Sequence, residues 1–173
     1  YYWRIEPGVK YYCDIDYDVF QFMQQNEILY GFTISMFEYA DTIPSLWLLF
    51  NEFMNINDYE KRDLIDFVQN DDKDKTYNLC HFWTNFEIAD LRIFRNSKYQ
   101  KFFQYLDQLG GFYYERWGDA PVHSLFILSF LNAEEVWWFG DIGYYHAPYL
   151  QCPSDTSVRS KGKCSCNPEK DFL

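Results

Sequence analysis

β-branched and aromatic residues cluster in two segments at the start of the chain. Tyr1 to Ile5 and Val9 to Ile15 have this composition and predict strands, with a turn at Pro7-Gly8 between them. Asp18 is a suitable N-cap for a short helix from Val19 to about Asn26. The opening of the chain therefore predicts two strands followed by a helix.

Apolar residues then recur with the spacing of buried helices and strands. Ile43 to Ile56 carries them at helical spacing, with Pro44 tolerable in the first turn. Further helices are predicted at Lys61 to Gln69, Lys98 to Leu109 and Val122 to Leu131, and further strands at Ile28 to Phe37, Thr76 to Trp83 and Val136 to Phe139. Strands that alternate with helices predict an α/β layered fold.

Four carboxylates lie in turns that follow predicted strands. They are Glu6, Glu38, Glu87 and Asp141. In open α/β sheets, ligands bind beyond the carboxyl ends of strands, so these side chains are expected to converge on one crevice. The charged segment 70–75 has no apolar anchor and is expected to be solvated surface.

Charge and composition narrow the class of ligand. With 26 acidic and 15 basic residues, the formal net charge is −11, which argues against nucleic-acid binding. Aromatic residues make up 23% of the chain, and aromatic rings suit both cores and stacking against sugars. No run of 18 apolar residues is present, so any membrane anchor is expected outside this stretch.

Five cysteines indicate an oxidising compartment rather than a zinc site, because they lack paired CxxC spacing. Cys13 and Cys80 both fall on predicted central strands and are expected to pair. Near the end of the chain, Cys152 is expected to pair with Cys164, which leaves Cys166 for a partner outside the sequence. The odd count and the abrupt apolar start indicate a piece of a longer polypeptide.

Five longer motifs carry a resemblance to a known family. They are "YYWRIEPGVKYYCDIDYDVF", "YGFTISMFEYADTIPSLW", "TYNLCHFWTNFEIADL", "GGFYYERWGDAPVHS" and "DIGYYHAPY". In this order, over about residues 1 to 153, they resemble the fungal Golgi α-1,2-mannosyltransferases of glycosyltransferase family 15. Motifs of this length are more specific than any short pattern in the sequence.

The resemblance implies a fold, a reaction and a location. The implied fold is GT-A, an α/β fold with a mixed sheet flanked by helices. Residues 1–153 would be the C-terminal part of its catalytic domain and residues 154–173 a loop or tail. The implied reaction is retaining transfer of mannose from GDP-mannose to the 2-hydroxyl of a mannose-terminated N- or O-linked glycan, with Mn²⁺ as cofactor. The implied location is the Golgi membrane, with a lumenal catalytic domain on a type II anchor.

Two sets of residues are candidates for the manganese ligands. "CDIDYD" contains Asp-x-Asp twice, and carboxylates suit this ion. The resemblance instead favours Glu6, in the Glu-Pro-Gly turn, together with His146 of "GYYHAPY". His81 and His123 lie in apolar settings and are expected to be structural.

A retaining transfer needs a group on the face of the anomeric carbon opposite the diphosphate, and in glycosidases this group is a carboxylate. Glu87 is the first candidate, because aromatic residues near it in the sequence are expected to form a dry cleft. They are Phe82, Trp83 and Phe86. Asp119 is the second candidate, and its structural alternative is to cap a helix.

Five further side chains are candidates for contacts with donor and acceptor. By the resemblance, Glu38 lines the acceptor pocket, where a carboxylate accepts hydrogen bonds from sugar hydroxyls. Arg4 is expected either to approach the diphosphate or to pair with a nearby acid. Trp83, Tyr113 and Trp117 are candidate stacking surfaces. The alternative function is a carbohydrate-binding module that performs no transfer.

Overall fold

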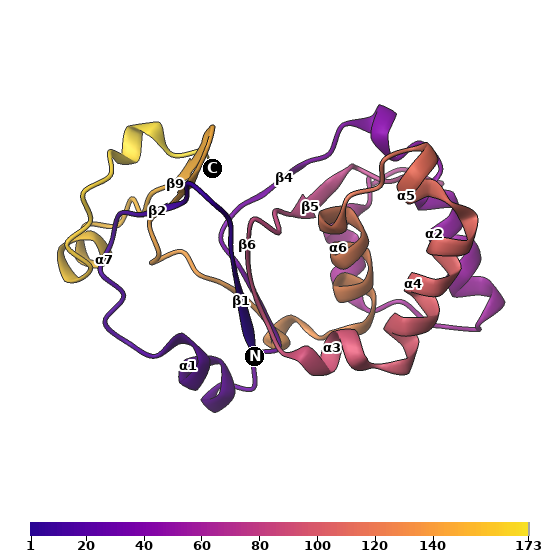
Figure 1. Ribbon diagram of the computed structural model, residues 1–173, viewed down its shortest axis with the longest axis horizontal. Coiled ribbons are helices and arrows are strands. Elements are labelled where there is room, and N and C mark those ends of the chain that lie inside the picture. Colours follow the sequence, from indigo (N-terminus) through magenta and orange to yellow (C-terminus); the bar gives the residue numbers. More distant parts are fainter. Residues whose placement is uncertain (173) are drawn as a thin grey trace. The chain divides into compact units, whose positions relative to one another are not determined.

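The structure is a computed structural model and describes residues 1–172 (Figure 1). The chain divides into two compact units. Unit 1 consists of Tyr1–Ile34, Trp83–Ala89 and the chain from Glu134 onward. Unit 2 consists of Ser35–Phe82 and Asp90–Ala133.

Unit 1 is built on two sheets. The larger has the strand order β1-β6-β3-β7, formed by Tyr2–Ile5, Phe86–Ala89, Tyr30–Phe32 and Val136–Trp138. β6 is antiparallel to β1 and β3, whereas β3 and β7 are parallel. The smaller sheet joins β2, β8 and β9 in antiparallel pairs, from Lys10–Tyr11, Tyr144–His146 and Tyr149–Gln151. The turn at Pro7-Gly8 therefore carries the chain from one sheet to the other instead of closing a hairpin.

The helices of unit 1 are short. They are α1 (Val19–Gln25), α7 (Thr156–Lys161) and the 3-10 helix η4 (Pro168–Lys170). A further 3-10 turn, η3 (Ala133–Glu135), begins at the last residue of unit 2 and precedes β7. Asp18 caps α1 as predicted, because its carboxylate accepts hydrogen bonds from the backbone N–H groups of Phe20 and Gln21 at 2.9 and 3.0 Å.

Unit 2 packs helices around one strand pair. The antiparallel strands are β4 (Ser35–Phe37) and β5 (Cys80–Phe82). The helices are η1 (Ala40–Thr42), α2 (Leu46–Ile56), η2 (Asp63–Val68), α3 (Leu91–Arg95), α4 (Ser97–Leu109), α5 (Gly111–Tyr114) and α6 (Asp119–Phe130). α6 is buried along most of its length, as expected for a helix that is apolar on all sides. The Phe82 N–H donates to Ser124 Oγ at 2.8 Å and so joins β5 to α6.

The structure confirms a mixed α/β composition and the three long helices that were predicted. α4 ends at Gly110, which has φ +76°, a left-handed conformation that favours glycine. The predicted strand at 28–37 is in fact two strands that belong to different sheets. The predicted helix at 61–69 is a 3-10 helix, and the predicted strand at 76–83 keeps only three strand residues.

The disulfides differ from the predicted pairs. Cys13 is bonded to Cys164 and Cys152 to Cys166, while Cys80 is the free cysteine among residues 1–172. The predicted pairs were wrong because the end of the chain returns to β2. The Asp14 N–H donates to the Gly162 carbonyl at 2.6 Å, which brings Cys164 beside Cys13. Two disulfides are typical of proteins from the lumen of the secretory pathway.

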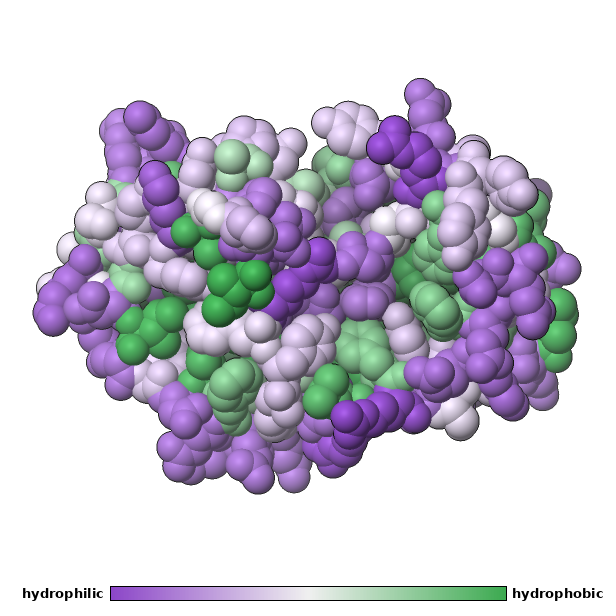
Figure 2. Space-filling model, viewed as in Figure 1, coloured by the Kyte–Doolittle hydropathy of each residue, from purple (hydrophilic) through white to green (hydrophobic). Residues whose placement is uncertain are grey.

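In the view of Figure 2, hydrophilic residues cover most of the visible face and apolar patches are small. Segment 70–75 is exposed, as predicted. Among the residues described, no helix has the length and apolar character needed to cross a membrane.

Candidate active site

One face of the β1–β6 ladder carries the main cluster of polar candidates in unit 1. Arg4 on β1 lies directly opposite Glu87 on β6, and Tyr2 shares its face because side chains alternate along a strand. The Tyr2 hydroxyl donates to Glu87 Oε1 at 2.5 Å, and Arg4 Nε donates to Glu6 Oε1 at 2.6 Å. The ladder thus aligns two carboxylates, a guanidinium and a phenol.

The sequence predicted that Glu87 lies in a turn beyond a strand, and this prediction was wrong. It is the second residue of β6, a central strand paired on both sides, and its side chain is only 1% exposed. Burial removes a carboxylate from water, so it must be held by hydrogen bonds from the protein. Tyr2 supplies one of these hydrogen bonds.

His146 is the last residue of β8, in the smaller sheet of unit 1. Its ring meets Trp83 edge-on, with 5.3 Å between ring centroids, and its Nε2 atom lies 3.5 Å from Asn85 Nδ2. Tyr144 is two residues earlier on the same strand and therefore points to the same face. Burial raises the pKa of Tyr144, and the neighbouring Tyr11 and Glu6 act in the same direction. The turn that carries Glu6 leads into β2, which pairs with β8, so Glu6 and His146 belong to neighbouring segments of unit 1.

The three acids of "CDIDYD" already have partners in unit 1. Lys163 Nζ lies 3.1 Å from Asp14 Oδ2, and Lys161 Nζ lies 3.7 Å from Asp16 Oδ1. Asp18 caps α1. This arrangement gives the acidic triplet a structural role.

The donor types at Glu6 and His146 fit a manganese ion, which accepts carboxylate and imidazole ligands. Their number is small, because within residues 1–172 no group of three His, Cys, Asp or Glu side chains is arranged to hold a metal. An ion at these two residues would need further ligands from a diphosphate, from water or from other parts of a longer protein. Arg4 also competes for the Glu6 carboxylate.

A second cluster of candidates lies in unit 2, at the start of α6. Glu38 directly follows β4, where its backbone N–H donates to the Leu79 carbonyl at 2.9 Å. Asp119 is the first residue of α6, and Gly118 occupies the N-cap position. The predicted N-cap role of Asp119 was therefore wrong by one position. A Cβ atom added to Gly118 would lie 4.0 Å from Glu38 Oε2, so the Glu38 carboxylate reaches the N-terminus of α6.

His81 belongs to this second cluster and was assigned only a structural role from the sequence. It lies on β5 opposite Met36 and is 3% exposed. Its Nδ1 atom has no hydrogen-bond partner among the residues described. Burial lowers the pKa of His81, while the nearby carboxylates Glu38 and Asp119 oppose this shift. The sequence around His81 is an apolar strand and gives no sign that two carboxylates lie near its ring.

The aromatic candidates differ in how much surface they offer. Tyr113 on α5 is 76% exposed and open to a ligand. Trp117 is 5% exposed, packs against Gly111 and donates from Nε1 to Glu115 Oε2 at 2.8 Å, which favours a structural role. Trp83 is half-buried in unit 1 and packs edge-on against Tyr149 as well as His146.

Each unit therefore holds its own group of candidates. Unit 1 contains Arg4, Glu6, Trp83, Glu87 and His146, whereas Glu38, Tyr113, Trp117 and Asp119 belong to unit 2. The fourth acid expected in the crevice, Asp141, accepts a hydrogen bond from the Tyr17 hydroxyl at 2.8 Å in unit 1.

The sequence of this chain is similar to those of known proteins. The chain is 59% identical over 172 residues to the probable mannosyltransferase MNT3 of Candida albicans, and 53% identical over 174 residues to the alpha-1,2 mannosyltransferase KTR1 of Saccharomyces cerevisiae. These alignments cover 99% of this chain but only 45% and 44% of the relatives, so the chain spans less than half of their length.

The fold of this chain is also similar to that of a solved structure. Core-mannan synthase A from Aspergillus fumigatus, in its Mn/GDP form, superposes with a TM-score of 0.88 at 43% identity, over 99% of this chain and 47% of that one. The sequence pattern described as glycolipid 2-alpha-mannosyltransferase matches residues 1–173. Because that match extends over the whole sequence, the chain belongs to the glycolipid 2-alpha-mannosyltransferase family.

Proposed function

We propose that this chain is part of a retaining α-1,2-mannosyltransferase with a GT-A catalytic domain. The donor is GDP-mannose and the acceptor is the 2-hydroxyl of a mannose residue on an N- or O-linked glycan in the Golgi lumen. The match to mannosyltransferases and to an Mn/GDP-form structure supports the reaction class. Residues 1–153 belong to the catalytic domain in this proposal, and residues 154–173 are its tail.

The observation that carries the proposal is the buried carboxylate of Glu87. It is held by the Tyr2 hydroxyl on the ladder that also carries Arg4, and Arg4 in turn holds Glu6. During transfer, the bond from the anomeric carbon to the diphosphate breaks, a bond from that carbon to the acceptor oxygen forms, and the acceptor hydroxyl proton passes to the departing diphosphate. A fixed carboxylate in a dry site stabilises the positive charge that develops on the sugar.

The remaining candidates supply binding in this proposal. Glu6 and His146 would hold Mn²⁺, which offsets the charge of the departing diphosphate when it is bound. Glu38 accepts hydrogen bonds from acceptor hydroxyls, and the exposed ring of Tyr113 offers a face for stacking. Asp119, at the N-terminus of α6, is the second candidate for the catalytic carboxylate.

Two variants of the full-length enzyme test this assignment. Glu87→Gln is expected to abolish mannose transfer from GDP-mannose while GDP affinity changes less than twofold, because the change removes charge and little shape. Asp74→Asn, in the exposed loop 70–75, is a matched control for loss of a carboxylate and should retain wild-type turnover. Wild-type turnover in Glu87→Gln would remove Glu87 from the mechanism. An inactive Asp119→Asn beside a slow Glu87→Gln would exchange the two roles.

A further inference from the structure

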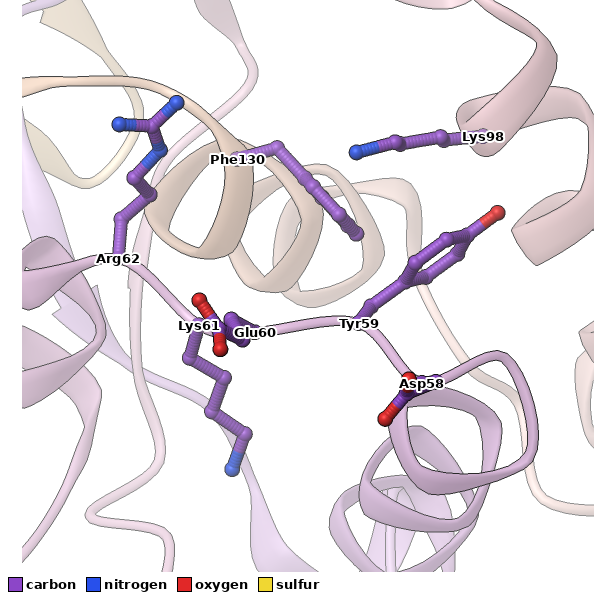
Figure 3. Close-up of a pocket in the computed structure, with 7 residues that line it drawn as sticks. All are labelled: Asp58, Tyr59, Glu60, Lys61, Arg62, Lys98 and Phe130. Atoms are coloured by element: carbon purple, nitrogen blue, oxygen red, sulfur yellow. The ribbon is translucent and has the colours of Figure 1, made fainter.

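A pocket of about 520 Å³ lies in unit 2, away from all the candidates described so far (Figure 3). Three segments line it: the loop between α2 and η2, the start of α4 and the end of α6. The lining residues are Asp58, Tyr59, Glu60, Lys61, Arg62, Lys98 and Phe130. Nothing in the proposed transfer reaction uses any of these side chains.

The loop that forms one wall is fixed by its own backbone. The Tyr59 N–H donates to the Met54 carbonyl at 2.9 Å, and the Arg62 N–H donates to the Ser129 carbonyl at 3.1 Å. Asp58 takes a left-handed conformation with φ 54°, which turns the loop away from the end of α2. The pocket is therefore formed before any ligand binds.

Lys98 contributes an ammonium group that aromatic rings hold in place. Its Nζ atom lies 4.9 Å from the centre of the Tyr59 ring and 5.0 Å from the centre of the Phe130 ring (Figure 3). Among residues 1–172, no carboxylate forms an ion pair with Lys98. Its N–H donors thus remain available to a ligand in the pocket.

Charged residues of both signs line the pocket. Lys98 and Arg62 bring two positive charges, and the exposed carboxylates of Asp58 and Glu60 bring two negative ones. The fifth charged residue, Lys61, points away from Lys98 and Phe130 in Figure 3, and its ammonium already donates to Asn51 Oδ1 at 2.5 Å. Because carboxylates stand beside the cations, the lining does not have the uniformly positive charge of a polyanion site. A neutral polyhydroxyl ligand uses donors and acceptors alike, because each hydroxyl both donates and accepts.

The position of the pocket sets the size of such a ligand. Phe130 is the last residue of α6 and Asp119 is the first, so the pocket lies about 16 Å along the helix from Asp119. A single sugar that reacts near Asp119 cannot reach Phe130. An oligosaccharide of several units, or a second glycan branch, can.

We propose that this pocket binds a neutral mannose-containing oligosaccharide. The identity of the sugar rests on the proposed function, whereas the polyhydroxyl chemistry follows from the lining. Lys98 and Arg62 donate hydrogen bonds to the glycan, Glu60 and Asp58 accept them, and Phe130 and Tyr59 form an apolar wall.

Calorimetry on the full-length protein tests the proposal, with an α-1,2-linked mannotetraose as the probe. Lys98→Met and, separately, Glu60→Gln are each expected to weaken mannotetraose binding at least tenfold. Lys101→Met is the matched control, since Lys101 is an exposed lysine of α4 outside the pocket, and it should bind like the wild type. Glu60 is exposed on a loop, so its variant is informative even if Lys98→Met folds poorly.

Three results would overturn the proposal. The first is mannotetraose affinity that stays unchanged in both pocket variants. The second is a loss of mannotetraose affinity in Lys101→Met as large as the loss in the pocket variants. The third is inorganic phosphate that binds the wild type and displaces mannotetraose in a Lys98-dependent way, which would identify an anion site. Transfer to methyl α-mannoside, measured separately on the wild type, reports on the proposed function. An inactive protein whose mannotetraose binding still depends on Lys98 would refute the transfer reaction and retain the glycan pocket.

Discussion

Lys163 Nζ lies 3.1 Å from Asp14 Oδ2, although 149 residues separate them in the chain. Together with the contact between Lys161 and Asp16, this pair gives the acidic segment "CDIDYD" its positive partners from the protein itself. A motif that resembles an Asp-x-Asp metal site is therefore engaged with lysines of the chain's own tail.

Manganese dependence should distinguish the two sets of proposed ligands. In the full-length enzyme, His146→Ala is expected to raise the Mn²⁺ concentration for half-maximal activity at least tenfold. The double change Asp14→Asn with Asp16→Asn should leave it within twofold, because these carboxylates are held by lysines. The reverse pattern in a metal titration would return the site to "CDIDYD".

Loss of the two disulfides should have unequal effects on stability. The Cys13–Cys164 bond joins residues 151 positions apart, and the Cys152–Cys166 bond joins residues 14 apart. By chain entropy alone, replacing both cysteines of the longer link by Ser should cost about 2 kcal/mol more than replacing those of the shorter one. Urea unfolding of the two double variants measures the difference. Equal costs would show that chain entropy does not dominate here.

His81 should make stability depend on pH. Its pKa is lowered in the folded protein, so below about pH 6.5 the unfolded chain takes up a proton that the folded chain resists. Stability is therefore fully present above pH 6.5 and falls as pH decreases, by at most about 1.4 kcal/mol per pH unit from this one group.

The test is a comparison of unfolding midpoints at pH 7.5 and 5.5. His81→Gln should reduce the loss of stability between these values. Met36→Leu, at the position opposite His81 on β4, changes packing without changing a titrating group. This variant should lose as much stability between the two pH values as the wild type. If His81→Gln lost as much stability between pH 7.5 and 5.5 as the wild type, His81 would not be the source of the pH dependence.

Gly111 is required by the close approach of Trp117. A Cβ atom added to Gly111 would lie 2.1 Å from Trp117 Cε2, so Gly111→Ala must displace a buried ring and is expected to cost about 1–3 kcal/mol. Gly118→Ala is the control, because its added Cβ would find its nearest neighbour at 3.7 Å. Thermal unfolding of the two variants should rank them in this order.

Tyr2→Phe should weaken the proposed reaction without changing the shape of the site. It removes the hydroxyl that donates to Glu87 at 2.5 Å and leaves a buried carboxylate with one hydrogen bond fewer, at a cost of about 1–3 kcal/mol. Turnover is expected to fall at least fivefold, with GDP affinity retained. Turnover equal to that of the wild type would show that Glu87 does not depend on Tyr2.

The sequence predicted the helices better than the strands. α2 and α4 have long apolar periodicity, and the ends of α1 and α4 carry a capping Asp18 and a left-handed Gly110. β3 and β4, in contrast, have three residues each, and their separation into two sheets depends on distant partners in β6 and β5. Local composition cannot reveal such a division.

The candidate site residues were identified mainly through long motifs in the sequence. The structural surroundings of these residues could not be predicted from those motifs. Nothing local indicated that Glu87 would be buried within a central strand, or that the tail would bring Cys164 to Cys13. His81 is buried on a strand, as its apolar setting in the sequence predicted, but nothing local indicated the neighbouring carboxylates of Glu38 and Asp119. These features arise from contacts between segments far apart in the chain, which periodicity and spacing do not encode.

The pairing of Arg4 with Glu87 limits how this protein can change in evolution. Because side chains alternate along a strand, inserting or deleting one residue in β1 would turn Tyr2 and Arg4 to the opposite face. One such event would separate Glu87 from its hydrogen-bond donor at once, whereas a substitution alters one contact at a time. Homologous chains are thus expected to exclude gaps from Tyr2–Ile5 and Phe86–Ala89 and to collect their length variation in exposed loops such as 70–75.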